Sequence, residues 1–303
     1  MPVSRVRVTV GERALELSNL DKVLYPEVGF TKGEVIHYYT AVAEVLLPHL
    51  ADRALTRIRY PDGVAAASFF EKNAPAATPG WVRVATLPAP GSTKNRETLD
   101  YVVADDLPTL VWLANLAAIE LHTPQWRIGA DPDLLVVDLD PGPPAGLREC
   151  ARVAVAVRDV LAADGLAALP KTSGRKGMQL AAAVSATQSA DVVSAYVRRV
   201  AQRLERAAPE RVTATMTKRL RTGKVFLDWS QNNAAKTTVA PYSLRAGPRP
   251  TVSTPLTWDE VAALADGSAP ARMPGPAEVL ERTAGGADLW RDLLVRGPAV
   301  PVD

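Results

Sequence analysis

The most informative segment of the chain is LLVVDLD, residues 134–140, followed by Pro141 and Gly142. A short apolar run that ends at a turn signal predicts a buried strand. Side chains two apart on a strand share a face, so Asp138 and Asp140 project together. Carboxylates so close repel unless a divalent cation lies between them or one takes a proton, and oxygen ligands suit Mg²⁺ or Mn²⁺. Taken singly, however, such a pair more often belongs to a turn or helix cap.

Around this strand, helical and extended patterns alternate. An amphipathic helix is expected over residues 146–165, a strand, turn and strand over 166–184, and a helix over about 190–207. The strand KVFLDW, residues 224–229, carries a third carboxylate, Asp228, among apolar neighbours. This alternation, without an internal repeat, predicts one mixed α/β body.

The N-terminal part of the chain is also patterned. We expect a hairpin over 5–17, a helix that begins at the capping-box pair Thr31 and Glu34, and strands over 54–60 and 67–73. Residues 86–100 are expected to form a long polar loop, and residues 107–122 a buried helix that ends near His122. A further helix is expected over about 277–296.

Composition excludes several classes of protein. The single cysteine, Cys150, rules out an intramolecular disulfide and a cysteine-rich zinc site. The N-terminus lacks an apolar signal region and no stretch reaches the ~18 apolar residues of a membrane span, so a cytoplasmic protein without a membrane partner is expected. Net charge is only +2, but residues 171–249 hold 15 Lys and Arg against 4 Asp and Glu. This basic segment predicts either a solvated face or a site for a polyanion.

A basic turn lies inside that segment. KTSGRKG, residues 171–177, offers backbone N–H groups, the Ser173 hydroxyl and the Lys176 ammonium, which are the groups that bind phosphate oxygens. Its spacing is not that of a P-loop, and a solvated hairpin turn explains it equally well. Lys236 and Arg245 are two further candidate phosphate contacts downstream.

Eight motifs make the sequence recognisable. In chain order they are LSNLDKVLYP (17–26), FTKGEVIHYY (30–39), SFFEKN (68–73), IELHTPQW (119–126), LLVVDLDPG (134–142), KTSGRKG (171–177), TMTKRLRTGKVFLDWSQNNAAKTT (215–238) and APYSLR (240–245). Over about residues 14–265 the chain resembles the polymerase domain of bacterial ligase D, within the archaeo-eukaryotic primase superfamily. The resemblance implies a mixed α/β (α+β) primase-polymerase fold, in which an RRM-like catalytic sheet packs against an N-terminal α/β portion. We expect a single domain over 1–303, with the N-terminal portion over about 1–130, the catalytic portion over about 131–250 and a helical tail over about 251–303.

The resemblance also implies roles for individual residues. The catalytic and metal-binding carboxylates map to Asp138, Asp140 and Asp228, which would hold two divalent metals, Mn²⁺ or Mg²⁺. Contacts to the incoming nucleotide map to His122, Ser173, Lys176, Gln179, Lys236 and Arg245. Contacts to DNA map to Lys22 and Lys32 for a downstream 5′-phosphate, Phe69 and Phe70 for the template, and Arg221 near the primer terminus. Because Phe69 and Phe70 are adjacent on a strand, we expect one to be in the core and only the other to stack on a base.

One position departs from the family pattern. Gln179 stands where the family usually has a histidine, and an amide can donate a hydrogen bond but cannot become a cation or pass a proton. Reduced triphosphate affinity or turnover is therefore expected. This departure keeps open a weakly catalytic module that binds DNA ends.

The function implied by the resemblance is DNA repair synthesis by a bacterial, nucleoid-associated enzyme. Such an enzyme adds NTPs, with ribonucleotides preferred, or dNTPs to a primer 3′-hydroxyl at gaps or broken ends with a 5′-phosphate. Non-homologous end joining is the expected pathway, with Ku and a separate ATP-dependent DNA ligase as partners; filling of short gaps in excision repair is the alternative. No ligase or nuclease motif follows, so a free-standing polymerase module is expected.

Overall fold

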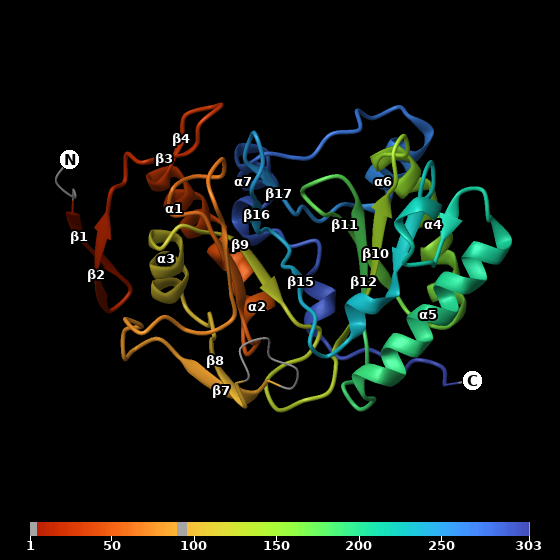
Figure 1. Ribbon diagram of the computed structural model, residues 1–303, viewed down its shortest axis with the longest axis horizontal. Coiled ribbons are helices and arrows are strands. Elements are labelled where there is room, and N and C mark those ends of the chain that lie inside the picture. Colours follow the sequence, from red (N-terminus) through yellow and green to blue (C-terminus); the bar gives the residue numbers. More distant parts are fainter. Residues whose placement is uncertain (1–4, 90–95, 303) are drawn as a thin grey trace. The chain divides into compact units, whose positions relative to one another are not determined.

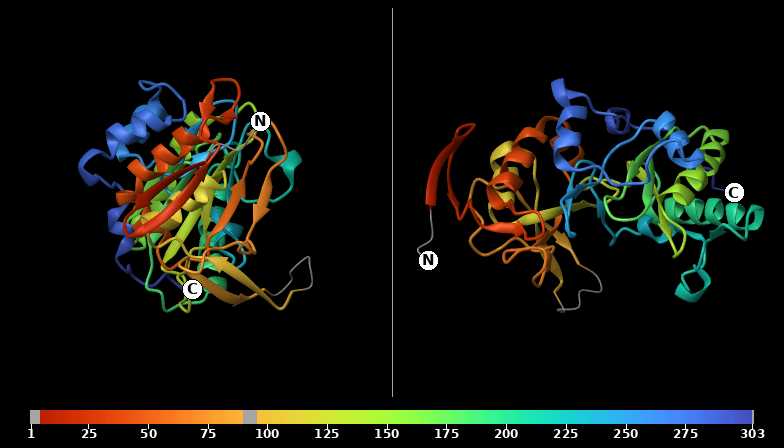
Figure 2. Two further views of the ribbon diagram at one scale, coloured as in Figure 1. Left: turned by 90° about the vertical axis from the view of Figure 1, so that its left-hand side faces the viewer. Right: turned by 90° about the horizontal axis from the view of Figure 1, so that it is seen from above.

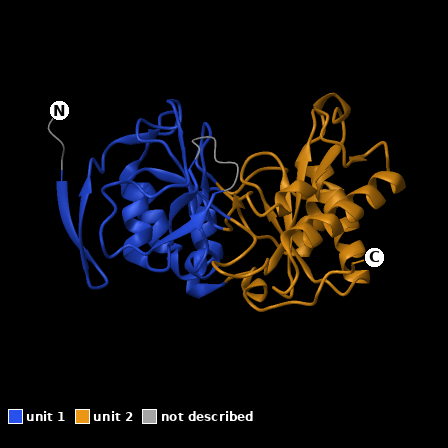
Figure 3. Ribbon diagram, turned by 60° about the horizontal axis from the view of Figure 1, so that its bottom comes forward, with its two compact units in different colours: residues 1–123, 242–251, 275–287 blue, residues 124–241, 252–274, 288–303 orange. Residues whose placement is uncertain are grey.

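The computed structural model describes residues 5–89 and 96–302, which form two compact units (Figures 1 and 3). Unit 1 comprises residues 1–123, 242–251 and 275–287, and unit 2 comprises residues 124–241, 252–274 and 288–303. The chain therefore passes between the units several times. Among the described residues, no helix is both long and apolar enough to span a bilayer.

Unit 2 is built on a five-stranded sheet with strand order β11-β12-β10-β14-β13. Its strands are β10 (Leu134–Pro141), β11 (Ala168–Thr172), β12 (Met178–Ala183), β13 (Val212–Thr213) and β14 (Val225–Asp228), and its long helices are α4 (Leu147–Ala163) and α5 (Ala190–Ala207). The order β10-α4-β11-β12-α5-β14, with β10 and β12 in the centre, is the β-α-β-β-α-β arrangement expected of an RRM-like sheet.

Strand alternation assigns the two faces of this sheet. Leu135, Val137 and Leu139 are fully buried in one core with the apolar stripes of α4 and α5. Val136 lies on the opposite face, in a small cluster with Trp290 and Leu293. The side chains of residues 138 and 140 belong to this second face, because they alternate with Leu139. The face without the two long helices is therefore the face that carries the aspartates.

The C-terminal part of unit 2 differs from the sequence prediction. Helix α6 (Trp258–Asp266), with a Thr257–Glu260 capping box, packs beside α4 and was not predicted. The helix expected over about 277–296 is shorter: α7 (Pro276–Arg282), which belongs to unit 1, ends before 3₁₀ turns η3 (Ala284–Gly286) and η4 (Arg291–Leu294). Gly285 and Gly286 both have positive φ, so the expected helix cannot continue beyond α7.

Unit 1 begins with the predicted hairpin, β1 (Arg5–Val10) and β2 (Arg13–Ser18), which pairs antiparallel. A second hairpin, β3 (Val23–Tyr25) and β4 (Phe30–Thr31), leads into α1 (Lys32–Ala41), which has the predicted Thr31–Glu34 capping box, and then α2 (Ala43–Leu50). Three further strands pair in the order β9-β5-β6: β5 (Thr56–Arg59), β6 (Phe69–Glu71) and β9 (Ala118–Thr123).

Two predictions for unit 1 were wrong. Both ends of the range 86–100, expected to be a polar loop, belong to the antiparallel strands β7 (Val84–Pro88) and β8 (Thr98–Val102). This hairpin extends away from the rest of unit 1 (gold in Figure 2). Residues 90–95 lie outside the described part of the chain. The helix expected over 107–122 is α3 (Leu107–Asn115) followed by β9. The change occurs at Ala117, whose positive φ of 56° separates the helix from the strand inside a mostly apolar segment.

Candidate active site

Three carboxylates lie on one face of the unit 2 sheet. Asp138 in β10 is the direct antiparallel partner of Asp228 in β14, and Asp140 lies two residues along β10. Directly opposed residues in an antiparallel pair have Cβ atoms ~4.5–5.5 Å apart. On the other side of β10, Asp138 pairs with Gln179 of β12, and Gln179 pairs with Lys171 of β11. The register alone thus aligns Asp228, Asp138, Gln179 and Lys171 in one row across four strands.

Each carboxylate is held by donors from its own neighbourhood. Asp228 Oδ1 accepts hydrogen bonds from the Ser230 backbone N at 3.0 Å and from Ser230 Oγ, and its Oδ2 accepts one from Gln231 Nε2 at 3.0 Å. Asp138 Oδ1 accepts one from Gln179 Nε2 at 3.1 Å, and Asp140 Oδ1 lies 3.6 Å from Lys176 Nζ. Throughout residues 5–89 and 96–302, no three Asp, Glu, His or Cys side chains are arranged to hold a metal ion. The metal-site assignment therefore stays a prediction that requires the carboxylates to turn from these donors.

Asp138 is the carboxyl whose ionisation the site perturbs most clearly. Burial raises its pKa from 3.8 to about 7, and the neighbouring charges of Asp140 and Asp228 act in the same direction. The hydrogen bond from Gln179 and the charge of Lys171 act in the opposite direction. A carboxyl so crowded by carboxylates favours a bound cation, and three hard oxygen donors fit Mg²⁺ or Mn²⁺. The chemistry of this donor set thus fits a divalent metal.

The basic turn packs against the strand that carries the aspartates. It connects β11 to β12, and Ser173 Oγ accepts hydrogen bonds from the backbone N of Gly177 at 3.1 Å and of Arg175 at 3.3 Å. A Cβ at Gly177 would lie 2.1 Å from the Leu139 carbonyl oxygen, so only glycine allows this approach. Lys176 Nζ lies 3.4 Å from the Pro141 carbonyl oxygen and remains well exposed. The predicted Lys176 is thereby brought beside Asp140, and Ser173 lies in the same turn.

Lys236 also belongs to this group. Its Nζ contacts Ser230 Oγ and lies 4.0 Å from Asp228 Oδ2. Arg221 is held differently: its guanidinium lies 3.6 Å above the Phe226 ring and Nη2 donates to the Met216 carbonyl oxygen at 2.7 Å. Lys236 therefore lies beside Asp228, whereas Arg221 stacks on Phe226.

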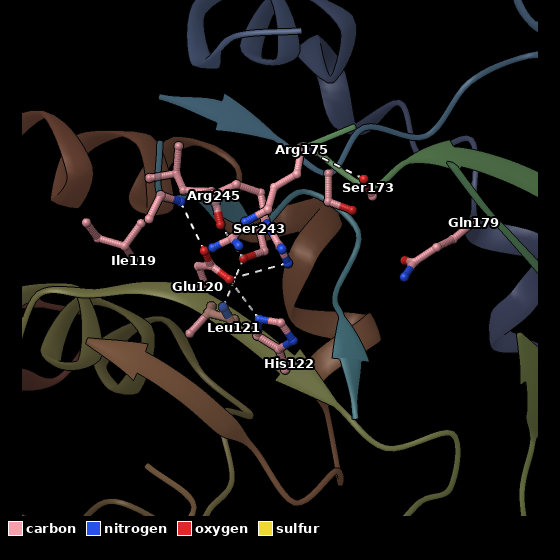
Figure 4. A network of polar contacts seen from close by, with 12 residues as sticks. Ile119, Glu120, Leu121, His122, Ser173, Arg175, Gln179, Ser243 and Arg245 are labelled. Atoms are coloured by element: carbon pink, nitrogen blue, oxygen red, sulfur yellow. Dashed lines mark hydrogen bonds and ion pairs between the residues drawn. The ribbon is translucent and has the colours of Figure 1, made fainter. Parts of the chain in front are cut away.

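A second polar cluster, in unit 1, contains the predicted His122 and Arg245 (Figure 4). Glu120, fully buried in β9, joins them: its Oε2 lies 3.0 Å from His122 Nε2 and 3.3 Å from Arg245 Nη1, and its Oε1 accepts from the Ala246 backbone N at 3.1 Å. His122 lies on β9, two residues beyond Glu120, so both project on one side of a strand and not from a helix end as predicted. Ser243 Oγ accepts from the Leu121 backbone N at 2.9 Å and ties this strand to the segment that carries Arg245.

Sequence reasoning missed two buried charged residues, Glu120 and Lys171. Glu120 lies in the motif IELHTPQW and Lys171 begins the basic turn KTSGRKG, and neither was predicted to be a site residue. The available signal was strand alternation. Had 118–123 been read as a strand, Glu120 and His122 would have shared a face, and a hairpin register would have set Lys171 opposite Gln179.

Both predicted template phenylalanines are exposed on β6. The exposed fraction is 50% for Phe69 and 61% for Phe70, so the expectation that one of them packs in the core was wrong. The reason is that β6 is a three-residue strand at the edge of its sheet, where neither face is covered. Both rings are therefore accessible.

Lys22 and Lys32 are ten residues apart in sequence and adjacent in space, because the Lys32 backbone N donates to the Lys22 carbonyl oxygen at 2.8 Å. Lys22 Nζ pairs with Asp62 at 2.8 Å. Lys32 Nζ is buried and donates to the Ser18 carbonyl oxygen at 2.5 Å and to Ser18 Oγ at 3.2 Å. Burial lowers the pKa of Lys32 from 10.5 to about 8, and the positive charges of Lys22 and Arg59 act in the same direction. Such a pair of cations gains from a bound anion.

Three comparisons with known proteins agree. Residues 31–290 match the family model of the LigD primase-polymerase domain. The multifunctional non-homologous end joining DNA repair protein LigD of Mycobacterium tuberculosis is 44% identical over 301 residues, which cover 96% of this chain and 38% of that protein. The bifunctional non-homologous end joining protein LigD of Bacillus subtilis is 34% identical over 249 residues, 82% of this chain and 39% of that protein. The chain thus spans less than half the length of these curated relatives.

A solved structure gives the same result for the fold. The polymerase domain of ligase D from Mycobacterium tuberculosis, in complex with DNA, superposes with a TM-score of 0.86 at 44% identity, covering 92% of this chain and 98% of that one. The predicted mixed α/β primase-polymerase fold is thereby confirmed. The chain belongs to the family of LigD primase-polymerase domains, which are DNA-directed nucleotidyltransferases.

Proposed function

We propose that this protein extends the 3′-hydroxyl of a primer by one nucleotide at a time at DNA gaps or broken ends. The observation that carries the proposal is the register of the unit 2 sheet, which pairs Asp138 with Asp228 and sets Asp140 on the same face. The family membership reported above supports the same reaction class.

The three aspartates would hold two divalent metals, Mn²⁺ or Mg²⁺. When bound there, such metals would supply Lewis-acid chemistry, which favours ionisation of a hydroxyl and offsets phosphate charge. Asp138 must give up its proton for this role, because burial raises its pKa to about 7. No side-chain nucleophile is needed.

The two lysines beside the carboxylates, and the hydroxyl in the same basic turn as Lys176, suit a triphosphate. Ser173, Lys176 and Lys236 can donate to phosphate oxygens and offset charge as pyrophosphate leaves, since charge-assisted hydrogen bonds are strong. The amide of Gln179 is a further candidate donor, although here it bonds to Asp138. On unit 1, Arg245 is assigned to phosphate and His122 to the sugar of the nucleotide, with Glu120 holding both side chains. Ribonucleotides are the preferred substrates in this proposal.

The DNA contacts divide into two groups. Lys22 and Lys32 form the site for a 5′-phosphate, supported by their adjacency and by the lowered pKa of Lys32. The exposed rings of Phe69 and Phe70 would stack on template bases, and Arg221 would lie near the primer terminus.

Non-homologous end joining is the pathway we propose, because the relatives are end-joining proteins. Ku and a separate ATP-dependent DNA ligase would be the partners, and a bacterial cytoplasmic, nucleoid-associated location follows. Gel shifts with two overhanging ends, with and without Ku, test this pathway. Exclusive binding to gaps of one to a few nucleotides would instead indicate excision repair.

The decisive experiment for the chemistry is primer extension with each ribonucleotide and deoxyribonucleotide, in Mn²⁺ and in Mg²⁺. We expect extension that is lost in Asp138→Ala and in Asp228→Ala. Near wild-type extension by either variant would refute the assignment. Tight DNA-end binding by the wild type without extension in either metal would support the weakly catalytic binding module that Gln179 suggested.

A further inference from the structure

Lys171 is a buried lysine with no role in the proposed reaction so far. Its side chain lies on the aspartate-bearing face of the unit 2 sheet, where it is covered and only 2% exposed. Nζ donates to Gln179 Oε1 at 2.5 Å and to Ser253 Oγ at 2.6 Å, and lies 5.5 Å from the centre of the Trp290 ring. Ser253 in turn donates to the Thr172 carbonyl oxygen at 3.0 Å, so the ammonium group is anchored.

The row of side chains connects this ammonium to Asp138. Lys171, Gln179 and Asp138 are register partners on three adjacent strands, and Gln179 Nε2 donates to Asp138 Oδ1 at 3.1 Å. Gln179 is itself buried, so its amide is enclosed between the two charged groups. The contact between Lys171 and Asp138 is therefore indirect and passes through one amide.

The polarity of the two end groups determines how that amide must lie. An ammonium group has donors and no acceptor, and an ionised carboxylate has acceptors and no donor. With Gln179 Oε1 on Lys171, the N–H faces Asp138. Were the amide turned over, its oxygen would face the carboxylate and its N–H would face the ammonium, and both contacts would be repulsive. An amide alone has no such preference, because its two ends differ little in size.

We propose that Lys171 is a positioning residue: by binding Gln179 Oε1 it holds the amide N–H toward Asp138 and so orients this carboxylate for the metal. The inference rests on the proposed function, in which Asp138 is a metal ligand. Lys171 does not touch the nucleotide or the reacting atoms. Partners that orient a ligand in this way typically change metal affinity by ~10–100-fold when they are removed.

The test compares Lys171→Met, which keeps the length and removes the donors, with Gln179→Leu and with the double variant, all in the full chain. Mn²⁺ affinity is measured from free Mn²⁺ by electron paramagnetic resonance, and primer extension is measured across a Mn²⁺ series. We expect about 10-fold weaker Mn²⁺ binding in each single variant. The double variant should be no weaker than Gln179→Leu alone, because Lys171 acts through Gln179. Excess Mn²⁺ should restore extension in the Lys171→Met variant.

A control separates positioning from a general loss of stability. Val157→Ala removes buried apolar atoms from α4, on the other face of the sheet, and should lower stability without changing Mn²⁺ affinity. Should Lys171→Met fail to fold, Lys171→Gln, which keeps a donor for Gln179 Oε1 and removes the charge, takes its place, and wild-type Mn²⁺ affinity in Gln179→Leu would still overturn the inference.

Wild-type Mn²⁺ affinity in either single variant would overturn the inference, as would independent, multiplying effects in the double variant. Asp138→Asn in the same assay separates this failure from failure of the proposed function. If Asp138→Asn loses Mn²⁺ binding while Lys171→Met and Gln179→Leu keep it, only the positioning role is wrong. If Asp138→Asn also binds Mn²⁺ like the wild type, the metal site itself is wrong.

Discussion

Replacing Asp138 by asparagine should stabilise the metal-free protein, and increasingly so as the pH rises. The folded protein keeps a proton on Asp138 up to about pH 7, whereas the unfolded chain releases it near 3.8. The folded state therefore binds more protons between these values, and the stability of the wild type falls as pH rises through that window and levels off above it. Asparagine does not titrate, so the stability of the variant should not fall in this pH window. Its Oδ1 can still accept the hydrogen bond from Gln179.

The magnitude follows from the two pKa values. The pKa rises from 3.8 to about 7, and each pKa unit corresponds to about 1.36 kcal/mol. Above pH 7, the asparagine variant can therefore exceed the wild type in free energy of unfolding by at most about 4 kcal/mol. Asp138 is partly exposed and its neighbours can relax, so we expect roughly half of that limit. Below about pH 4 the difference between variant and wild type should nearly vanish.

The assay is urea unfolding of both proteins in excess chelator, at about pH 4 and about pH 8. Added Mn²⁺ serves as the control, because it should stabilise the wild type and not the asparagine variant. The reasoning is refuted if the variant is no more stable than the wild type at the higher pH. It is equally refuted if the difference between the two proteins is the same at both pH values.

Further predictions concern the DNA and nucleotide contacts. Lys22→Ala or Lys32→Ala should weaken binding to gaps with a 5′-phosphate and leave 5′-hydroxyl gaps unchanged in fluorescence anisotropy; equal losses on both would contradict a dedicated phosphate site. Phe70→Ala should lower single-stranded template affinity by about 1–3 kcal/mol, and wild-type affinity would exclude stacking. Glu120→Gln removes the charge that holds Arg245, so the KM for the nucleotide should rise in steady-state extension, whereas an unchanged KM would show that the contact only stabilises the fold. DNA affinity should fall linearly with the logarithm of salt concentration, and a flat dependence between low and moderate salt would argue against a basic DNA site.

Much of the fold could be predicted from local pattern. The capping box at Thr31, the amphipathic periodicity of α4 and α5, and the apolar run of β10 each specify an element through contacts within a few residues. The errors fell where local pattern is ambiguous. Residues 107–121 are mostly apolar, and a buried helix and a buried strand share that composition, so the turn at Ala117 is what separates α3 from β9.

The sequence predicted which neighbouring residues of the candidate site lie together, but not which distant ones do. Asp138 and Asp140 could be placed together because a strand has a period of two. That Asp228 joins them depends on strand pairing over some ninety residues of intervening chain, and no local rule specifies it. The same pairing sets Gln179 between Asp138 and Lys171, where the sequence shows only an unusual residue.

By itself, the sequence determined the identity of the chemical groups: three carboxylates, a basic turn with Ser173 and Lys176, and the motifs that mark the family. Only the tertiary structure decided which of these groups meet and in what state of charge. Burial and the neighbouring carboxylates raise the pKa of Asp138, and burial of Lys32 beside Lys22 lowers its pKa. The physical reason is that both register and desolvation arise from segments distant in sequence, so neither can be computed from a residue and its immediate neighbours.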